Sequence, residues 1–320
     1  MEKKGVKKSA GLKNINDNVD ETQFSGFGRD LVKRCLLNGL TSVKELEESY
    51  GSISQGRLYA FQMDVADDES VRKSRKLVDS VLREKGLVLH ALINNAGVRG
   101  NLFYDEFLIL DDYKEVWDVN MLGVIRVTHT FRDLIKKSRG RIVTCSSGIV
   151  SFPAPGNAPY ATSKYAIQAY SIVIRHELQP YGVDVIDIVP GDFSTEMQSI
   201  ERLIKMVDKV WYRASQKKRD EFGKDYHEKA KKFAKNMVQW FVEKDTTWVI
   251  DAYYEAIVAK RPRLLHRVGW DLLLVFLPYS FLSLRLQLHI MKLLMLAIGA
   301  PLPAMAKRNS YSDSRECKSD

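Results

Sequence analysis

Short apolar runs alternate with longer amphipathic stretches through the middle of the chain. Four of these runs have the character of buried strands, and they lie at residues 58–65, 87–97, 141–147 and 183–191. Between the second and the third, residues 111–131 have the apolar spacing of a helix. Because parallel strands are joined by crossovers that usually contain helices, the alternation across residues 57–193 predicts an α/β fold with a parallel sheet.

The most hydrophobic stretch of the chain is residues 269–298. Its longest run without a charge, Leu272–Leu284, is shorter than the roughly 20 residues that span a bilayer. The stretch is interrupted by Asp271, Pro278, Arg285, His289 and Lys292. We therefore expect two short helices broken near Pro278 and no transmembrane helix. They would form a lid over an apolar substrate, dip into a lipid surface, or dock on the protein itself or on a second subunit.

The chain begins with a polar segment. Residues 1–20 contain no apolar run, which predicts a flexible tail, and neither a signal peptide nor a hydrophobic anchor is recognisable there. We assign residues 21–268 to one domain, and residues 269–320 to a hydrophobic helical extension followed by a polar tail.

The formal net charge of +9 has two interpretations. Basic residues gather at the N-terminus and in segments 136–141, 215–235 and 260–268, without the interleaved aromatic side chains of a nucleic-acid-binding surface. We expect no nucleic-acid partner. A solvated face explains such runs by default, and contact with an anionic membrane surface is the functional alternative.

Cysteine and histidine are too scattered to form a disulfide framework or a metal site. Cys35, Cys145 and Cys317 are widely spaced and odd in number, which indicates a reducing, intracellular compartment. The six histidines show no ligand spacing, so we expect no metal.

Three residues near the middle of the chain form a proton-transfer pattern. Tyr160 and Lys164 lie one helical turn apart, and Ser147 precedes Tyr160 by thirteen residues. A tyrosine hydroxyl titrates at a pKa of about 10, and an ammonium group on the same helix face favours the phenolate and lowers that pKa. A serine hydroxyl can hold a substrate oxygen at the same point. The trio therefore suits proton exchange with an alcohol or ketone, provided that a cofactor carries the hydride.

Three motifs occur in a fixed order: NNAG at 94–97, Ser147 with YATSK at 160–164, and PGDFST at 190–195. In this order and spacing they resemble the short-chain dehydrogenase/reductase family, and the resemblance extends over roughly residues 25–300. It implies a Rossmann-like, doubly wound parallel sheet that binds NAD or NADP at the carboxyl ends of its strands. It also makes residues 21–268 the dinucleotide-binding and catalytic domain.

The same resemblance implies a role for each matching residue. Tyr160 would be the general acid/base, Lys164 its pKa tuner and a ribose ligand, and Ser147 the group that orients the substrate carbonyl. Asn120 would kink its helix and support a water relay to Lys164. Further residues would line the cofactor: Gly26 and Gly28 in a glycine-rich turn, Asp64 by the adenine, Asn94, Ala96 and Gly97 along the adenosine side, and Pro190, Gly191 and Thr195 at the nicotinamide.

The glycine-rich turn departs from the family's T-G-x-x-x-G-x-G pattern. In ETQFSGFG, Glu21 and Thr22 stand where the pattern has its threonine and its first glycine. A branched residue adopts positive φ less readily than glycine, and a carboxylate repels a pyrophosphate. The strand before this turn is missing from the sequence, and residues 28–39 run into the next helical segment without the strand expected between them. We therefore expect a sheet that lacks its first and second strands.

Towards the C-terminus, residues 211–233 and 261–283 are similar to the retinol dehydrogenase and 17β-hydroxysteroid dehydrogenase branch of the family. This similarity implies a lipophilic, retinoid-like or steroid-like alcohol or ketone as substrate, with NAD favoured over NADP. It also implies association with the endoplasmic reticulum membrane, with the cytoplasm as the alternative. Residues 195–248 would form the substrate loop and its helices.

Two other functions stand beside an NAD(P)-dependent oxidoreductase. The altered turn favours a non-catalytic homologue or truncated isoform that cannot bind cofactor and serves as a binding or dimerisation partner. A third hypothesis makes residues 260–310 a basic amphipathic module bound to membranes. The family commonly pairs through the helices that carry Asn120 and Tyr160. On the second helix we assign an apolar stripe to the core, with a homodimer interface as the alternative: Ala161, Tyr165, Ala169, Ile172 and Val173.

Overall fold

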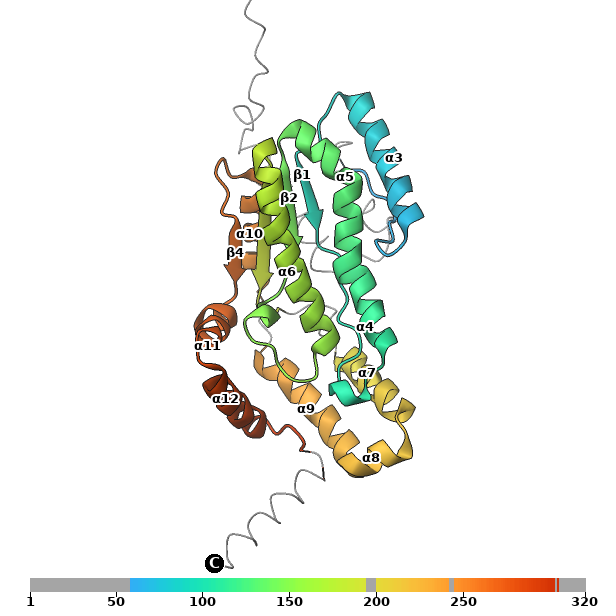
Figure 1. Ribbon diagram of the computed structural model, residues 1–320, viewed down its shortest axis with the longest axis vertical. Helices are drawn as coiled ribbons and strands as arrows, with labels where there is room; N and C mark the ends of the chain where they lie inside the picture. Colours follow the sequence, from blue (N-terminus) through green and yellow to red (C-terminus); the bar gives the residue numbers. More distant parts are fainter. Residues whose placement is uncertain (1–57, 194–199, 242–244, 303, 305–320) are drawn as a thin grey trace, which may run out of the picture.

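Four parallel strands form the sheet of the computed structural model, which describes residues 58–193, 200–241, 245–302 and 304 (Figure 1). Their order across the sheet is their order in the chain: β1 (Ala91–Asn94), β2 (Arg141–Cys145), β3 (Asp184–Pro190) and β4 (Leu265–Val268). Every crossover between them contains at least one helix. The parallel α/β fold predicted from the alternation is therefore confirmed.

Ten α-helices lie within the described ranges. They are α3 (Asp68–Lys85), α4 (Leu110–Trp117), α5 (Val124–Ser138), α6 (Ala158–Leu178), α7 (Ile200–Arg213), α8 (Gln216–Phe222), α9 (Tyr226–Phe241), α10 (Thr247–Val258), α11 (Leu277–Ser280) and α12 (Leu284–Ala297). A π-helical turn, Asp118–Gly123, joins α4 to α5, and a second one, Leu272–Phe276, leads into α11.

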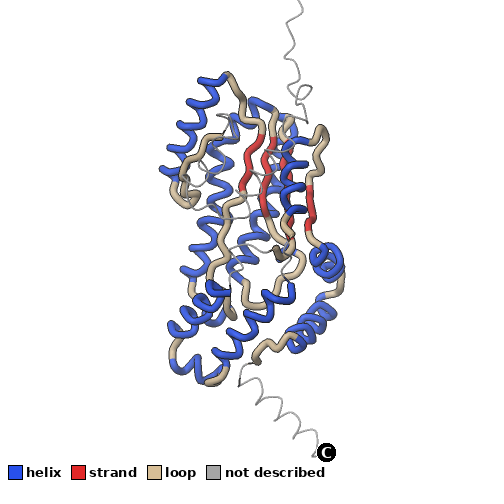
Figure 2. Tube along the Cα trace, turned by 180° about the vertical axis from the view of Figure 1, so that it is seen from behind, coloured by secondary structure: helices blue, strands red, loops and turns tan. Residues whose placement is uncertain are grey.

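The two faces of the sheet are covered by different helices, because side chains alternate between the faces along each strand. Ile142 and Val185 share one cluster with Ile174 of α6. Their neighbours Val143 and Ile186 share another with α10. In Figure 1, α6 lies in front of the strands, and Figure 2 gives the view from behind. Burial on both faces accounts for the high apolar content of β2 and β3.

The segment 58–65 does not form a strand, and this prediction was wrong. Residues 58–64 have no regular secondary structure, and the Asp64 carboxylate accepts a hydrogen bond from the amide of Ala66 at 2.8 Å in the turn before α3. A strand is held by the ladder it shares with a neighbour, and within the described residues β1 is the edge of the sheet. The polar tail and the two strands predicted to be missing concern residues 1–57, outside the described residues.

The sequence did not reveal β4, which has only four residues. Arg175 of α6 connects this strand region to the rest of the sheet through hydrogen bonds. Its guanidinium donates hydrogen bonds to the carbonyl oxygens of Val185 at 2.8 Å and Leu264 at 3.3 Å, and to the Asp187 carboxylate at 3.4 Å. The helix that carries Tyr160 is thus fixed to β3 and to the residue before β4.

The C-terminal extension packs on the domain through one of its faces. Leu272, Phe276 and Met291 share a buried cluster with Phe152, whose ring stacks on Phe276 at a centroid distance of 4.8 Å. The break predicted near Pro278 falls after it, at residues 281–283. Pro278 is the second residue of α11, which continues without a break from the π turn Leu272–Phe276.

The other face of the extension is apolar and exposed. Phe281, Leu284 and Leu288 are 80%, 76% and 71% exposed. Arg285 and Lys292 lie in the same helix, α12. Within the described ranges, none of the helices combines the length and the apolar character needed to cross a bilayer.

The apolar stripe of α6 is not core, and that assignment was wrong. Tyr165, Ile172 and Val173 are 44%, 46% and 53% exposed, and of the five residues only Ala161 is buried. The buried face instead contains Ile167, Ser171 and Ile174, which follow one another at intervals of one helical turn. Because α6 is apolar on more than one side, helical spacing alone cannot identify the side that meets the sheet.

Below the sheet in Figure 1, α7, α8 and α9 form a separate helical layer. An aromatic cluster holds it to the segment after β1. Phe107 stacks on Trp211 at 5.7 Å between centroids and meets Phe222 edge-on at 4.6 Å. These helices fall within residues 195–248, the region predicted to cover the substrate.

Candidate active site

A cavity of about 800 Å³ lies at the carboxyl ends of β1, β2 and β3. Its walls come from the loops after these strands, from α6 and α7, and from the C-terminal extension. Open parallel sheets hold ligands at this edge. Ser147, Tyr160 and Lys164, predicted from sequence to act together, all line the cavity.

Lys164 is buried and fixed by the end of β2. Its Nζ donates a hydrogen bond of 2.9 Å to the carbonyl oxygen of Cys145, and the residue is 5% exposed. The same Nζ lies 5.7 Å from the centre of the Tyr160 ring. Since an ammonium group carries three donors, others remain for a ligand while the carbonyl holds the side chain beside the phenol.

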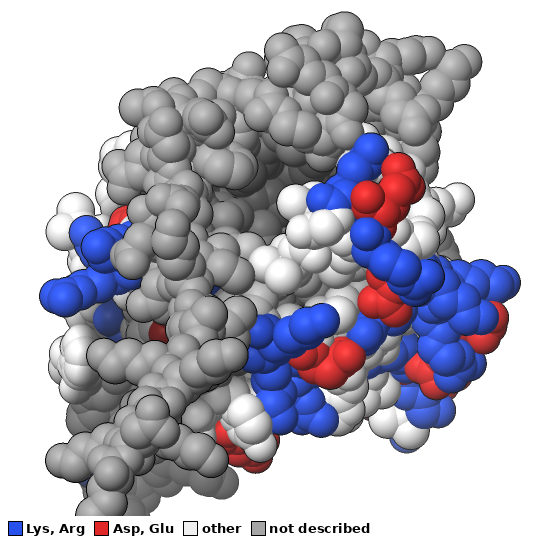
Figure 3. Space-filling view, turned by 90° about the horizontal axis from the view of Figure 1, so that it is seen from above, with Lys and Arg blue, Asp and Glu red and all other residues white. Residues whose placement is uncertain are grey.

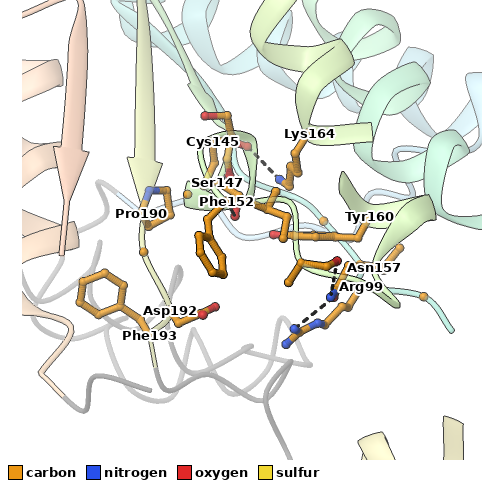
Figure 4. Close-up of a pocket in the computed structure, with 18 of the residues that line it drawn as sticks. Arg99, Cys145, Ser147, Phe152, Asn157, Tyr160, Lys164, Pro190, Asp192 and Phe193 are labelled. Atoms are coloured by element: carbon orange, nitrogen blue, oxygen red, sulfur yellow. Dashed lines mark hydrogen bonds between the residues drawn. The ribbon is translucent and has the colours of Figure 1, made fainter. Parts of the chain in front are cut away.

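Ser147 follows β2 and begins a short turn. Its Oγ accepts a hydrogen bond from the amide of Ile149 at 3.3 Å. The hydroxyl hydrogen is therefore available for an acceptor in the cavity, such as a carbonyl oxygen. Figure 4 shows Ser147, Lys164 and Tyr160 along one side of the cavity, with Phe193 opposite them.

Asn120 lies in the π-helical turn, so the predicted distortion of its helix is present. Its side-chain oxygen accepts from the Val98 amide at 2.7 Å, and its nitrogen donates to the Val98 carbonyl at 2.9 Å and to Ser163 at 3.0 Å. A Cβ at Gly97 would lie 3.4 Å from the Asn120 oxygen and 3.6 Å from Lys164 Nζ. Glycine at this position therefore leaves room beside Lys164 Nζ, and Lys164 lines the cavity.

The residues assigned to the cofactor divide into three groups. Those that line the cavity are Ala96, Gly97, Pro190 and Gly191. Asn94 is buried below it, where its side-chain nitrogen donates to Thr128 at 3.0 Å, and Asp64 lies in the turn before α3. Gly26, Gly28 and Thr195 lie outside the described residues.

Asp271 supports the floor of the cavity, a role that the sequence did not suggest. Its carboxylate accepts a hydrogen bond of 2.7 Å from the amide of Asp192, next to Gly191. A Cβ at Gly191 would lie 2.1 Å from an oxygen of Asp271. The only sequence signal was an acidic residue within an apolar stretch, which we interpreted as an interruption.

Tyr253 of α10 fixes the NNAG segment from the face of the sheet that lies opposite α6. Its hydroxyl donates a hydrogen bond of 2.7 Å to the side-chain oxygen of Asn95. Burial raises the pKa of this phenol well above its usual value, so that it stays protonated as a donor. The loop after β1 is therefore held on one side by Tyr253 and on the other by Asn120.

The sequence is similar to known proteins along most of its length. The family model for short chain dehydrogenase matches residues 23–203. The 3beta-hydroxysteroid dehydrogenase dhs-16 of Caenorhabditis elegans is 35% identical over 233 residues, which are 73% of this chain and 60% of that protein. Retinol dehydrogenase 16 of Homo sapiens is 35% identical over 266 residues, 81% of this chain and 82% of that protein.

Solved structures agree on the fold. A short-chain dehydrogenase from Streptomyces avermitilis has a TM-score of 0.59 and 21% identity, over 85% of this chain and 95% of that one. A short chain dehydrogenase/reductase from Burkholderia phymatum, solved in complex with NAD, has a TM-score of 0.54 and 21% identity, over 70% and 75% of the two chains. These likenesses establish the doubly wound fold, and the family model and the relatives establish descent. The chain belongs to the short-chain dehydrogenase family, in its retinol dehydrogenase-like branch.

Proposed function

We propose that this protein is an NAD(P)-dependent dehydrogenase that interconverts an alcohol and a carbonyl on a lipophilic, retinoid-like or steroid-like substrate. The observation that carries the proposal is that Ser147, Tyr160 and Lys164 line one cavity at the carboxyl edge of the sheet. The names of the relatives, a steroid dehydrogenase and a retinol dehydrogenase, support the substrate class.

The residues of the chain would divide the chemistry among them. Tyr160 takes the proton of the substrate hydroxyl during oxidation and returns it during reduction. Ser147 donates a hydrogen bond to the substrate oxygen and orients it. Lys164 keeps a positive charge beside the Tyr160 ring, which stabilises the phenolate when the proton is on the substrate. Asn120 holds the loop after β1 at the cavity wall.

The cavity has features that suit a nicotinamide dinucleotide. Of NAD and NADP, we propose NAD. A bound nicotinamide supplies the hydride chemistry that the side chains lack. Lys164 would hold a ribose hydroxyl through its remaining donors, which the missing side chain at Gly97 leaves accessible. Pro190 and Gly191 would border the ring.

The test uses the full chain, with retinol and a hydroxysteroid as substrates and NAD or NADP as oxidant. We expect turnover with at least one pair, and we expect the Tyr160→Phe variant to lose it, since the substitution removes only the proton carrier. Tyr165→Phe is the matched control, because Tyr165 lies on the same helix, is 44% exposed and does not line the cavity. Equal turnover by Tyr160→Phe and wild type would refute the assigned role.

Direct binding separates this function from the non-catalytic alternative. Titration with NADH and NADPH, followed by energy transfer from tryptophan to the nicotinamide, reports whether the chain forms a dinucleotide site. Saturable binding would support the dehydrogenase. A folded chain that binds neither would support the non-catalytic alternative. Glu21 and Thr22 favour that alternative, because they stand where the family pattern has its threonine and its first glycine.

The exposed apolar face of α12 supports peripheral contact with a membrane such as that of the endoplasmic reticulum. Leu284 and Leu288 lie one turn apart and are exposed, and Arg285 and Lys292 add positive charge. We expect the chain to float with anionic vesicles and to lose this property in a Leu284→Ser/Leu288→Ser variant. Unchanged flotation would remove α12 as the contact.

The exposed stripe of α6 supports a homodimer. Tyr165, Ile172 and Val173 would be covered by the same helix of a second copy, as the family resemblance implies. Sedimentation equilibrium tests this: an Ile172→Asp variant should be monomeric if the stripe is the interface. A dimer that survives the substitution would place the interface elsewhere.

A further inference from the structure

We propose that a second, apolar pocket beside the main cavity binds the end of the substrate farthest from the reacting hydroxyl, and that the substrate is therefore an elongated alcohol with an uncharged tail. The inference deepens the proposed function and rests on it, because it names the substrate class of the same site. This pocket, the annex, has a volume of about 140 Å³. Most of its wall comes from segments 102–104 and 154–157, from α7 and α9, and from the end of the C-terminal extension.

The annex and the main cavity share part of their walls. Five residues line both: Arg99, Ala154, Asn157, Asp192 and Met295. Arg99 donates a hydrogen bond of 3.3 Å to the side-chain oxygen of Asn157, and Figure 4 shows this pair beside Tyr160. The annex therefore adjoins the main cavity at the place where the proposed proton carrier lies.

The position of Tyr160 directs a bound substrate towards this junction. Tyr160 is the third residue of α6, and Asn157 is the residue just before the helix. Because the side chains of a helix lean towards its N-terminus, the phenol of Tyr160 leans towards Asn157. A substrate held by its hydroxyl at Tyr160 can therefore extend its other end past the junction and into the annex.

The annex is lined by apolar faces of two helices. Leu203 and Val207 of α7 lie one turn apart, and the lining residues of α9 recur at helical spacing. The latter are Tyr226, Ala230, Phe233 and Ala234. Phe103 meets the Tyr226 ring edge-on at 6.1 Å between centroids. Burial raises the pKa of the Tyr226 hydroxyl, so this group stays uncharged.

The charged side chains at the annex lie at its junction with the main cavity. Among the described residues that line the annex, the charged ones are Arg99 and Asp192, and both also line the main cavity. The face at the other end of the molecule, seen in Figure 3, instead carries Lys and Arg among Asp and Glu. An apolar tail would displace water from the helical faces of the annex, whereas a charged tail would lose its hydration there. The annex therefore favours an uncharged tail.

The volumes indicate how long this tail is. If the proposed function is correct, the main cavity of about 800 Å³ holds part of the cofactor as well as the substrate. A pocket for one drug-sized ligand typically measures about 300–1,000 Å³, so two ligands leave little room there. Since an apolar cavity of about 150 Å³ accepts a benzene ring, the annex has room for about six further carbon atoms.

The test uses geraniol, farnesol and geranylgeraniol, which share an allylic alcohol and differ in the number of isoprene units. Their binding to the full chain is measured by isothermal titration calorimetry. We expect affinity to rise along the series. Ala234→Leu, which fills part of the annex, should weaken geranylgeraniol about tenfold and geraniol by less than about twofold. Ala169→Leu is the matched control, because Ala169 is exposed on α6 and lines neither space.

A second variant fills the annex from another segment. Ala300 belongs to the C-terminal extension and lines the annex but not the main cavity, so Ala300→Leu should have the same selective effect. Thermal unfolding shows which of the two variants is folded, and a folded one is sufficient for the test. Selective weakening of geranylgeraniol in a folded variant, but not in the control, supports the proposal.

Three results would overturn the proposal. They are a wild-type chain that does not bind geranylgeraniol more tightly than geraniol, an unchanged geranylgeraniol affinity in a folded variant, and an equal loss of affinity for all three alcohols. Oxidation of the same alcohols with NAD or NADP tests the proposed function separately. A chain that shows the selective weakening but oxidises none of them has the annex without the dehydrogenase activity.

Discussion

A buried carboxyl group in β3 should make the stability of this protein fall as the pH rises. Asp187 is 1% exposed and faces α6, where its closest cation, Arg175, reaches it at 3.4 Å. Burial raises its pKa from 3.8 to about 6, against the opposing pull of Arg175. Asp187→Asn keeps the shape of the side chain and removes its titration.

The magnitude follows from linkage between proton binding and folding. A pKa raised from 3.8 to about 6 corresponds to about 3 kcal/mol between the fully protonated and the fully ionised limits. Because the folded state holds the proton more tightly than the unfolded one, the contribution of Asp187 is most favourable below pH 4 and is lost as the pH rises through about 6. About 1 kcal/mol of this loss falls between pH 5 and pH 7.

Urea unfolding at pH 5 and pH 7 measures the effect. We expect Asp187→Asn to gain about 1 kcal/mol relative to wild type on going from pH 5 to pH 7. Asp184→Asn, on the same strand but only partly buried, controls for the loss of a negative charge. If the free energies of wild type and Asp187→Asn change in parallel with pH, the reasoning from burial is refuted.

Two further predictions concern stability. The Arg141 guanidinium donates hydrogen bonds of 2.5 to 2.9 Å to three carbonyl oxygens at the end of α10, so Arg141→Met should cost about 2–4 kcal/mol in urea unfolding, against less than about 0.5 kcal/mol for the exposed control Arg72→Met. An equal cost for both would contradict the capping role. A Cβ at Gly140 would lie 2.2 Å from the carbonyl oxygen of His90, so Gly140→Ala should lower the melting temperature more than Gly86→Ala, which has positive φ but no atom within 4 Å. The reverse order would mean that the backbone near His90 yields easily.

The parts of the fold that the sequence predicted are those with unmistakable local signals. β2 and β3 are rich in apolar residues because both faces of the sheet are covered, and Tyr160 and Lys164 are placed together by helical spacing alone. β4 gave no comparable signal, since four residues with a histidine and an arginine among them do not make an apolar run. The exposed side of α6 was assigned to the core because two of its faces are apolar.

The site was predicted less completely than the fold, because much of its wall comes from distant segments. Asp271 reaches Gly191 from eighty residues further along the chain, and no local pattern links the two. The residues of α7 that line the cavity belong to no motif in the sequence, and only the position of the helix beside the cavity distinguishes its two sides. Asn94 belongs to the NNAG motif, but as the end of β1 it points into the protein interior.

The π-helical turn at Asp118–Gly123 makes the helix irregular, but it also positions Asn120 beside the loop after β1. A π turn accommodates one residue more than regular α-helical hydrogen bonding does. Deleting a single codon there would restore the regular pattern and would rotate the preceding helix by about 100°. Asn120 would then leave Val98, and the loop after β1 would lose its anchor. The proposed activity therefore implies that selection removes the deletion that would make this helix regular, and a homologue without activity would be free to lose the additional residue.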